Sequence, residues 1–216
     1  MTVLNKLATS LGRRDEIPNQ LLAGQIVRAQ DQQAVTELVE HLSHRDRRIQ
    51  NDCIKVLYEI GETNPDLIAE HRLVFAGLLK SKNNRLVWGA MTALDHITLK
   101  EPRGVYRLLP EILAAADTGS VIARDHAISI LTKLATFNQF SKKCVPVLME
   151  QLKTCPSNQF PMYAEMSLKV VNQKSVRLFR EAIGNRLARL AKESQKKRIT
   201  RVLRQMESRR DSIGPL

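Results

Sequence analysis

The sequence predicts an all-α fold that stacks four helix pairs of 37 residues each, with capping helices at both ends. The main observation is a three-residue apolar code that recurs four times, each copy 37 residues after the one before. Within a copy the residues stand at offsets 0, 4 and 7, which places them on one face of a helix. The code residues are Cys53, Leu57 and Ile60; Ala90, Leu94 and Ile97; Ala127, Leu131 and Leu134; and Ala164, Leu168 and Val171. A fixed period of this size is typical of helical repeats that bury their apolar faces against one another.

A second helix precedes each copy of the code. One large apolar residue stands 15 residues before the first member of each copy: Leu38, Phe75, Ile112 and Met149. These residues lie in helix-like stretches at 34–42, 71–79, 106–115 and 143–152. Polar links containing Ser, Asn and Asp join the two helices of a pair, and such residues cap the helix that follows. The sequence has no run of β-branched and aromatic residues alternating at period two, so we expect no strands.

Two of the first helices contain a proline, Pro110 and Pro146. Helix pairs of this length with a proline in the first helix resemble HEAT repeats, and the resemblance covers residues 31–173. Thr36 and Leu73 stand at the place equivalent to Pro110 in the other two units. The period is also slightly below the about 40–47 residues of HEAT and armadillo units. The resemblance implies a right-handed α-α superhelix, a HEAT-like or armadillo-like solenoid, with a proline kink in the first helix. It implies no particular function, because this architecture serves many.

The repeat register also divides the chain. We expect N-terminal capping helices over residues 1–30 and basic C-terminal capping helices with a short tail over 174–216, all in one elongated domain. Between them, four repeats would span 31–65, 66–102, 103–139 and 140–173. The code then ends, because its next positions are Arg201, Gln205 and Ser208. Terminal repeats deviate in this way because their outer face meets water.

Cysteine usage and hydropathy bound the location of the protein. The three cysteines form no CxxC pair, which argues against a secreted disulfide framework or a zinc knuckle. Cys53 occupies a core position of the code. No apolar run has the length of a signal peptide or approaches about 18 residues, so we expect no transmembrane segment. A reducing, cytoplasmic location follows.

Positive charge is concentrated at the C-terminal end. The chain carries a net charge of +12, of which residues 174–216 contribute +9 through 13 basic and four acidic residues. Apolar residues at helical spacing, from Leu187 to Met206, make this segment one or two basic amphipathic helices. Three interpretations stay open: a capping pair with solvated charges, a nucleic-acid contact, or contact with an acidic protein or anionic membrane. The predicted anion or nucleic-acid contacts are Arg186, Arg189, Lys196, Lys197, Arg198, Arg201 and Arg204.

Two Asp-His pairs on second helices, Asp95-His96 and Asp125-His126, are the candidates for chemistry. The register aligns Asp125 with Trp88, so we expect an aromatic and acidic ridge along the exposed side of the second helices. In HEAT-like arrays this ridge usually lines the concave surface. Such a groove loosely resembles that of the HEAT-like DNA glycosylases, which remove alkylated bases with the help of an acidic residue. With one Trp and a repeat body that is not strongly basic, this enzyme is the minority alternative.

We expect no cofactor, metal or catalytic set. A catalytic zinc needs three convergent ligands, whereas adjacent residues on a helix diverge by about 100°. The sequence contains no Gly-rich phosphate loop, nucleophile elbow or HExxH motif. We therefore favour a non-enzymatic scaffold that binds another protein in the groove lined by the second helices, where Trp, Tyr and Arg would dominate the binding energy. The predicted groove residues are Arg48, Asn51, Lys55, Tyr58, Arg85, Trp88, Asp95, Asp125, His126 and Tyr163.

Overall fold

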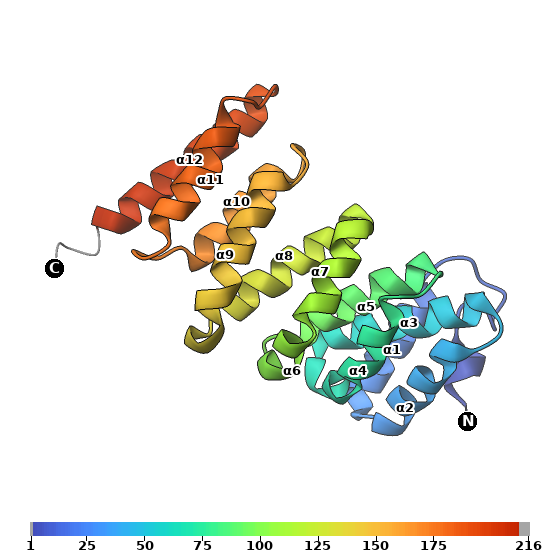
Figure 1. Ribbon diagram of the computed structural model, residues 1–216. Coiled ribbons are helices and arrows are strands. Elements are labelled where there is room, and N and C mark those ends of the chain that lie inside the picture. The colour runs from blue at the N-terminus through green and yellow to red at the C-terminus, as the bar shows by residue number, and fades with distance from the viewer. Residues whose placement is uncertain (1, 212–216) are drawn as a thin grey trace. The chain divides into compact units, whose positions relative to one another are not determined.

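The computed structural model describes the backbone of residues 2–211 and the side chains of residues 2–208. Over this range every regular element is a helix, as the sequence predicts (Figure 1). The chain divides into two compact units, residues 1–127 and 128–216, and the division falls inside helix α8. Because each pair in a helical stack contacts mainly its neighbours, a stack divides readily into such units.

The N-terminal unit begins with the short 3-10 helix η1 (Val3–Lys6) and with α1 (Ile17–Ala29). Three groups of helices follow, and each group ends in a long second helix. The groups are α2 (Gln32–Glu40), η2 (His41–Ser43) and α3 (Arg47–Thr63); η3 (Pro65–Leu67), η4 (Ala69–His71), α4 (Arg72–Leu78) and α5 (Asn84–Ile97); and α6 (Pro102–Arg107), α7 (Leu109–Thr118) and α8 (Val121–Ala135).

The C-terminal unit contains the rest of α8 and five further elements. These are α9 (Asn138–Thr154), α10 (Phe160–Ser167), η5 (Leu168–Val170), α11 (Val176–Leu187) and α12 (Glu193–Asp211). The basic C-terminal segment therefore forms two helices. Helix α11 packs on α9, and α12 packs on α10.

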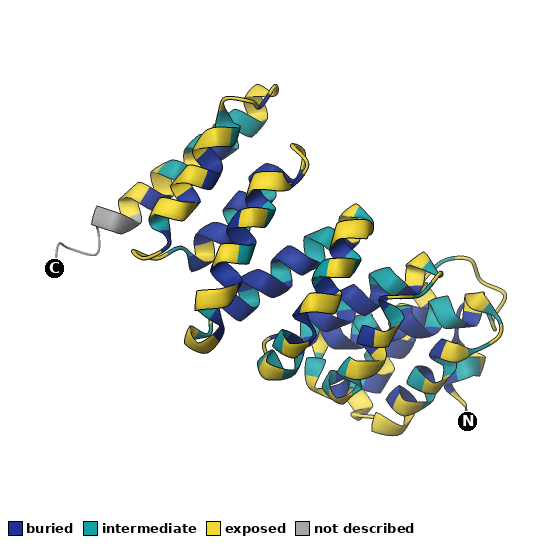
Figure 2. Ribbon diagram, in the orientation of Figure 1, coloured by how far each residue is buried: buried dark blue, intermediate teal, exposed yellow. Residues whose placement is uncertain are grey.

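The repeated code faces the core. Eleven of its twelve residues are buried, and Val171 is half-buried. The large apolar residues of the first helices, Leu38, Phe75, Ile112 and Met149, are also buried. Figure 2 shows the buried residues in dark blue along the helix sides that face neighbouring helices within each unit. Packing of these periodic apolar faces is thus what holds each unit together.

Polar residues cap three second helices, as the sequence predicts. Helices α3, α5 and α8 begin at positions 47, 84 and 121, each one residue after a polar cap. The Asp46 side chain accepts a hydrogen bond from the N–H of Arg48, and the Asn83 side chain accepts one from the N–H of Arg85. Ser120 Oγ accepts from the N–H of Ala123 at 3.3 Å. Each cap satisfies a donor that the first helical turn leaves open.

The prolines act differently from each other. Pro146 lies inside α9, as expected. Pro110 does not kink a continuous helix, so that expectation is wrong: the chain breaks at Leu108 into α6 and α7, and Pro110 is the second residue of α7. Proline is tolerated there because the first turn of a helix has no partner for the missing N–H.

The fourth copy of the code is the least regular. Helix α10 ends at Ser167, so Leu168 lies in η5 and Val171 lies beyond it. The β-branched pair Val170 and Val171 favours extended backbone over helix. Asn172 then forms a turn, since its Oδ1 accepts from the N–H groups of residues 174 and 175. Local turn chemistry therefore ends this helix before the code does.

The helix-pair arrangement continues one pair beyond the code. On α12 the residues at the predicted code positions, Arg201, Gln205 and Ser208, are exposed. Ile199, Val202 and Met206 are buried in their place. The core of the last pair is therefore apolar and helical like the others, but its register has slipped. A change in linker length produces such a slip without changing which helices pack together.

Candidate functional site

Six of the predicted groove residues lie together in the N-terminal unit, on α3 and α5, which pack against each other. Arg48 and Arg85 are exposed and the other four are half-buried. We call this set the second-helix surface. It consists of Arg48, Asn51, Lys55 and Tyr58 on α3 and of Arg85 and Trp88 on α5.

Two carboxylates hold Lys55 at the centre of this surface. Its Nζ lies 2.9 Å from Glu16 Oε2 and 2.6 Å from Glu59 Oε1, and 4.8 Å from the centroid of the Tyr58 ring. Burial is the largest influence on the pKa of Lys55 and lowers it, but hydrogen bonds with Glu59, Tyr58 and Glu16 together raise the pKa above its ordinary value. Burial likewise raises the pKa of Tyr58. At neutral pH Lys55 is therefore charged and Tyr58 is neutral.

Glu16 joins three helices. It directly precedes α1, bonds Lys55 of α3, and lies 3.7 Å from Arg85 Nη1 of α5. Neither Glu16 nor Glu59 was predicted from the sequence. Glu59 stands four residues after Lys55, a spacing that favours an ion pair on a helix and was a usable signal. Glu16 lies outside the repeats, and no local pattern connects it to α3.

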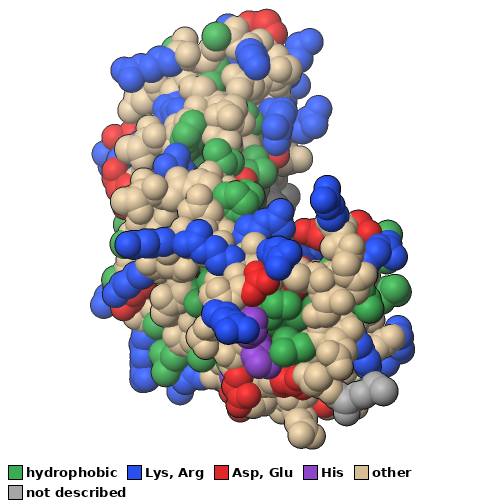
Figure 3. Space-filling view, turned by 90° about the vertical axis from the view of Figure 1, so that its right-hand side faces the viewer, with side chains coloured by type: hydrophobic (Ala, Val, Ile, Leu, Met, Phe, Trp, Pro, Cys, Tyr) green, Lys and Arg blue, Asp and Glu red, His purple; other side chains and the backbone are tan. Residues whose placement is uncertain are grey.

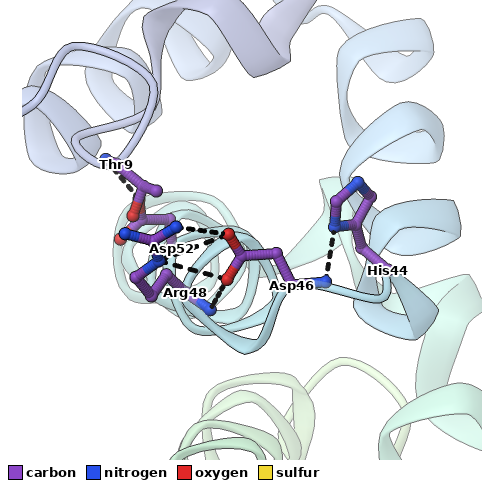
Figure 4. A network of polar contacts seen from close by, with 5 residues as sticks. All are labelled: Thr9, His44, Asp46, Arg48 and Asp52. Carbon is purple, nitrogen blue, oxygen red and sulfur yellow. Dashed lines mark hydrogen bonds and ion pairs between the residues drawn. The ribbon is translucent and has the colours of Figure 1, made fainter.

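The start of α3 carries a polar network (Figure 4). Arg48 Nη2 lies 2.8 Å from Asp46 Oδ2. The pKa of Asp46 is lowered to about 2, mainly by the hydrogen bond from the Arg48 side chain and secondly by the bond from the Arg48 backbone N–H. One turn later Asp52 accepts hydrogen bonds from the Thr9 N–H at 2.7 Å and from Asn19 Nδ2 at 2.9 Å. These bonds hold the Arg48 side chain and tie α3 to the N-terminal segment.

Asn51 and Trp88 are placed by the start of α5. Asn83 donates from Nδ2 to Asn51 Oδ1 at 2.9 Å and to Gln50 Oε1 at 3.1 Å. Trp88 follows one turn later and is half-buried, and its carbonyl accepts a hydrogen bond from the Thr92 hydroxyl at 2.9 Å. The indole is the only one in the sequence. Trp88 is therefore a half-buried aromatic residue on a helix that packs against α3.

The structure corrects the expectation that Asp95 lies on an exposed ridge. Asp95 is only 7% exposed, and its Oδ2 lies 2.9 Å from His126 Nδ1 on α8. His126 Nε2 lies 2.9 Å from Thr92 Oγ1. The Asp95 side chain is on the side of α5 that faces α8, which is why it is buried. Together the three residues tie α5 to α8.

The protons of the Thr92 hydroxyl and the His126 ring can be arranged in two ways. The Thr92 hydroxyl has one proton, and when it is donated to the Trp88 carbonyl, both ring nitrogens of His126 must donate, which requires the imidazolium. With a neutral ring that donates to Asp95, the hydroxyl proton points to Nε2 instead. The order carboxylate, imidazole, hydroxyl matches that of a hydrolytic triad. Here, however, the hydroxyl also bonds to its own helix and the network joins two packed helices, which is a structural role.

Tyr163 is the second correction, because it is fully buried in α10 and lines no surface. It stands at the repeat position of Gly89 and His126. Both of those residues meet the preceding second helix: a Cβ on Gly89 would lie against Ile54 of α3, and His126 contacts α5. This position therefore belongs to the contact between helices. Asp125 is half-buried on α8. Because Asp95 is buried, the acidic ridge of the glycosylase alternative keeps only one of its two predicted acids.

Comparison with known proteins identifies the fold. No protein-family model matches the sequence, and no curated protein matches it significantly. A solved structure of an engineered protein is 19% identical, covers 96% of this chain and 98% of that one, and has a TM-score of 0.65. A computationally designed armadillo repeat protein for modular peptide recognition is 14% identical, covers 85% of each chain and has a TM-score of 0.65. A designed armadillo repeat protein in complex with the peptide (KR)4 is 15% identical, covers 86% of this chain and 85% of that one, and has a TM-score of 0.61.

The chain has an armadillo-like helical-repeat fold. In the last helix pair, the basic residue Arg186 makes its contacts inside the C-terminal unit. Its Nη1 donates to the Leu152 carbonyl at 2.8 Å, and its guanidinium lies 4.4 Å from the centroid of the Phe160 ring. Arg198 Nε donates to Glu165 Oε1 at 2.8 Å, and this bond is the main reason that the pKa of Glu165 lies below its ordinary value. Both arginines therefore already have partners within the C-terminal unit.

The other residues predicted to contact an anion lie nearer the surface of the armadillo-like chain or in simple ion pairs. Lys196 pairs with Glu193 at 2.7 Å. Arg189, Lys197, Arg201 and Arg204 are exposed. Figure 3 shows one face of the molecule, on which Lys and Arg side chains (blue) are interspersed with acidic (red) and hydrophobic (green) ones.

Within residues 2–208, no three His, Cys, Asp or Glu side chains are grouped so that they would hold a metal ion. Within the described helices, none combines the length and the apolar run that a membrane span requires.

Proposed function

We propose that this chain is a non-enzymatic scaffold that binds a segment of another protein on the second-helix surface. The observation that carries the proposal is Trp88, a half-buried indole on a packed helix, flanked by the exposed Arg85 one turn before it. Trp, Tyr and Arg are the residue types that most often dominate binding energy at interfaces. Two structural neighbours are described as armadillo repeat proteins that recognise or hold peptides, which supports a peptide-like ligand.

The surface is organised before any partner arrives. Asn83 holds Asn51, Asp46 holds Arg48, and Glu16 with Glu59 holds Lys55. Side chains that are already ordered lose little conformational entropy on binding, so more of the contact energy contributes to affinity.

The charges of the surface are largely paired, and this defines the expected partner. Lys55 lies between two carboxylates, and Arg48 and Arg85 each have an acidic neighbour. A surface of paired charges exerts a weak field beyond the Debye length of about 8 Å at physiological salt. The proposed partner is therefore selected by aromatic contact and hydrogen bonding to an extended segment, and its affinity should vary little with salt.

Selection of peptides tests this proposal. A displayed library of random extended peptides is selected against the full chain, and the affinities of the enriched peptides are measured for wild type and Trp88→Ala. We expect Trp88→Ala to weaken binding at least about tenfold, or about 1.4 kcal/mol. The indole fluorescence of wild type should change on binding, because the chain has one Trp.

Leu99→Ala is the matched control, since Leu99 is an exposed apolar residue outside the second-helix surface. It should leave the affinities unchanged. Enriched peptides that bind Trp88→Ala within about twofold of wild type would show that the surface is not the binding site.

The same chain titrated with labelled duplex DNA tests the nucleic-acid alternative. Binding that falls steeply with salt and is abolished by Arg201→Glu with Arg204→Glu would move the function to α12.

A cytoplasmic location is part of the proposal. It is supported by the three cysteines, which are all buried as thiols rather than placed in a disulfide framework.

A further inference from the structure

A second surface lies at the N-terminal end of the chain, apart from the second-helix surface. Leu11, Ile17 and Leu21 are large apolar residues that are 55%, 53% and 62% exposed. They line one hollow of about 470 Å³, whose wall also includes the basic residues Lys6 and Arg13. Exposed apolar side chains that line one hollow, rather than standing singly on the surface, are a feature of interaction sites.

Helix α1 is apolar on two sides. Ala23 and Ile26 are buried, and α1 packs along α3. Ile17 and Leu21, four residues apart, form the opposite edge and line the hollow. The outward side of a surface helix is normally polar, so exposed aliphatic residues opposite its buried side are unusual. The exposed side of α1 is therefore shaped for a partner.

The charges around the hollow determine what that partner carries. Lys6 and Arg13 line it, and Arg14 is exposed beside them. Arg13 is already paired with Asp15 at 2.7 Å, whereas Lys6 Nζ donates to the uncharged amide oxygen of Gln25 at 3.5 Å. Lys6 and the exposed Arg14 therefore supply most of the positive charge offered to a partner. The lining itself contains basic but no acidic side chains.

We propose that this hollow is a docking site for an amphipathic helix of a partner protein, with aliphatic residues on its inserted face and acidic residues along its flanks. Aliphatic side chains spaced three and four residues apart on such a helix fill a hollow that runs beside α1, which is the helix-in-groove mode of recognition. The acidic flanks complement Lys6 and Arg14 and speed association.

Two other occupants fit less well. A second copy of this chain would bring its own Lys6 and Arg13 against the same residues, since a two-fold interface pairs a patch with itself. An anionic membrane would attract the basic residues, but a bilayer accepts protruding apolar groups, whereas these line a hollow.

Selection against a displayed library of amphipathic helical peptides tests the proposal. The peptides carry Leu on one face and randomised residues on the flanks, and the target is the full chain with Trp88→Ala, so that the second-helix surface does not contribute. We expect the flanks of the enriched peptides to be rich in Asp and Glu. Leu21→Glu should weaken their binding at least about tenfold, and Lys6→Glu several-fold.

Leu73→Glu is the matched control, because Leu73 is 66% exposed on α4 of the same unit but lies outside the hollow. Thermal unfolding of all variants checks that each is folded. Enriched peptides with basic flanks, or binding that Leu21→Glu leaves unchanged, would overturn the proposal.

Two further measurements separate the other occupants. Sedimentation at micromolar concentration should show the same mass for wild type and Leu21→Glu. A wild-type dimer that Leu21→Glu abolishes would replace the partner helix by a second copy. Binding of wild type to phosphatidylserine vesicles that Leu21→Glu abolishes would replace it by a membrane.

Discussion

The contact between α3 and α5 and the contact between α5 and α8 use the same repeat position with different chemistry. In the first, Gly89 has no side chain, and a Cβ there would lie 2.3 Å from Ile54 Cγ1. In the second, His126 reaches back to Asp95 and Thr92. The repeat register thus determines where neighbouring second helices meet, while the residue at that position determines whether they meet through close apolar packing or through hydrogen bonds.

The largest effect on stability is expected from truncating a core side chain of α5, the helix that takes part in both contacts. Leu94 of α5 is fully buried at a code position. Leu94→Ala should lower the free energy of unfolding by about 2–5 kcal/mol, because it leaves a cavity in addition to the lost burial. Urea unfolding of the full chain measures the change. A loss well below 1 kcal/mol would mean that the code does not form the core.

Gly89→Ala tests the close apolar contact. The added methyl group overlaps Ile54, so we expect destabilisation of about 1–3 kcal/mol. In a double-mutant cycle with Ile54→Ala the two effects should be less than additive, because the second change removes the clash.

Gly184 of α11 provides the control, since a Cβ there would meet nothing within 4 Å. Gly184→Ala should stabilise the chain by about 0.5–1 kcal/mol through helix propensity alone. Equal effects of the two Gly→Ala changes would argue against a tight contact at Gly89.

His126→Ala tests the polar contact. It leaves the buried carboxylate of Asp95 without its bond to His126, so we expect destabilisation of about 1–3 kcal/mol. The double variant with Asp95→Ala should lose less than the sum of the two single losses, because no buried charge is then left behind. Strict additivity of the two changes in thermal unfolding would show that the residues act independently.

The smallest effect is expected where α12 meets α10. Arg198 and Glu165 form an ion pair whose side chains are about two-fifths exposed, so Arg198→Met should cost no more than about 1 kcal/mol. The pKa of Glu165 is lowered from 4.5 in the folded chain. Its contribution is therefore present above pH 4.5 and is lost as the pH falls through the folded pKa. Unfolding curves of wild type and variant should converge in acid, and a gap that persists at low pH would contradict this sign.

Parts of the candidate site followed from the register, and other parts did not. The same 37-residue arithmetic that buries Leu94 places Asn51 and Trp88 at equivalent positions of α3 and α5. The expected exposure failed for Asp95, whose side chain meets His126 of α8, and for Tyr163, which is fully buried. A helical period distinguishes the core face from the other faces, but it does not say how closely the next helix approaches.

The sequence by itself determined the second helices of the first three pairs, their caps and their buried faces, because periodic apolar residues and local capping groups act within one or two turns. Only the tertiary structure decided that Glu16 pairs with Lys55, that His126 joins α5 to α8, and that Leu21 stays exposed in the first half of α1. These outcomes depend on residues that lie far apart in the chain and meet only when the helices stack. The spacing along one helix carries no information about such meetings.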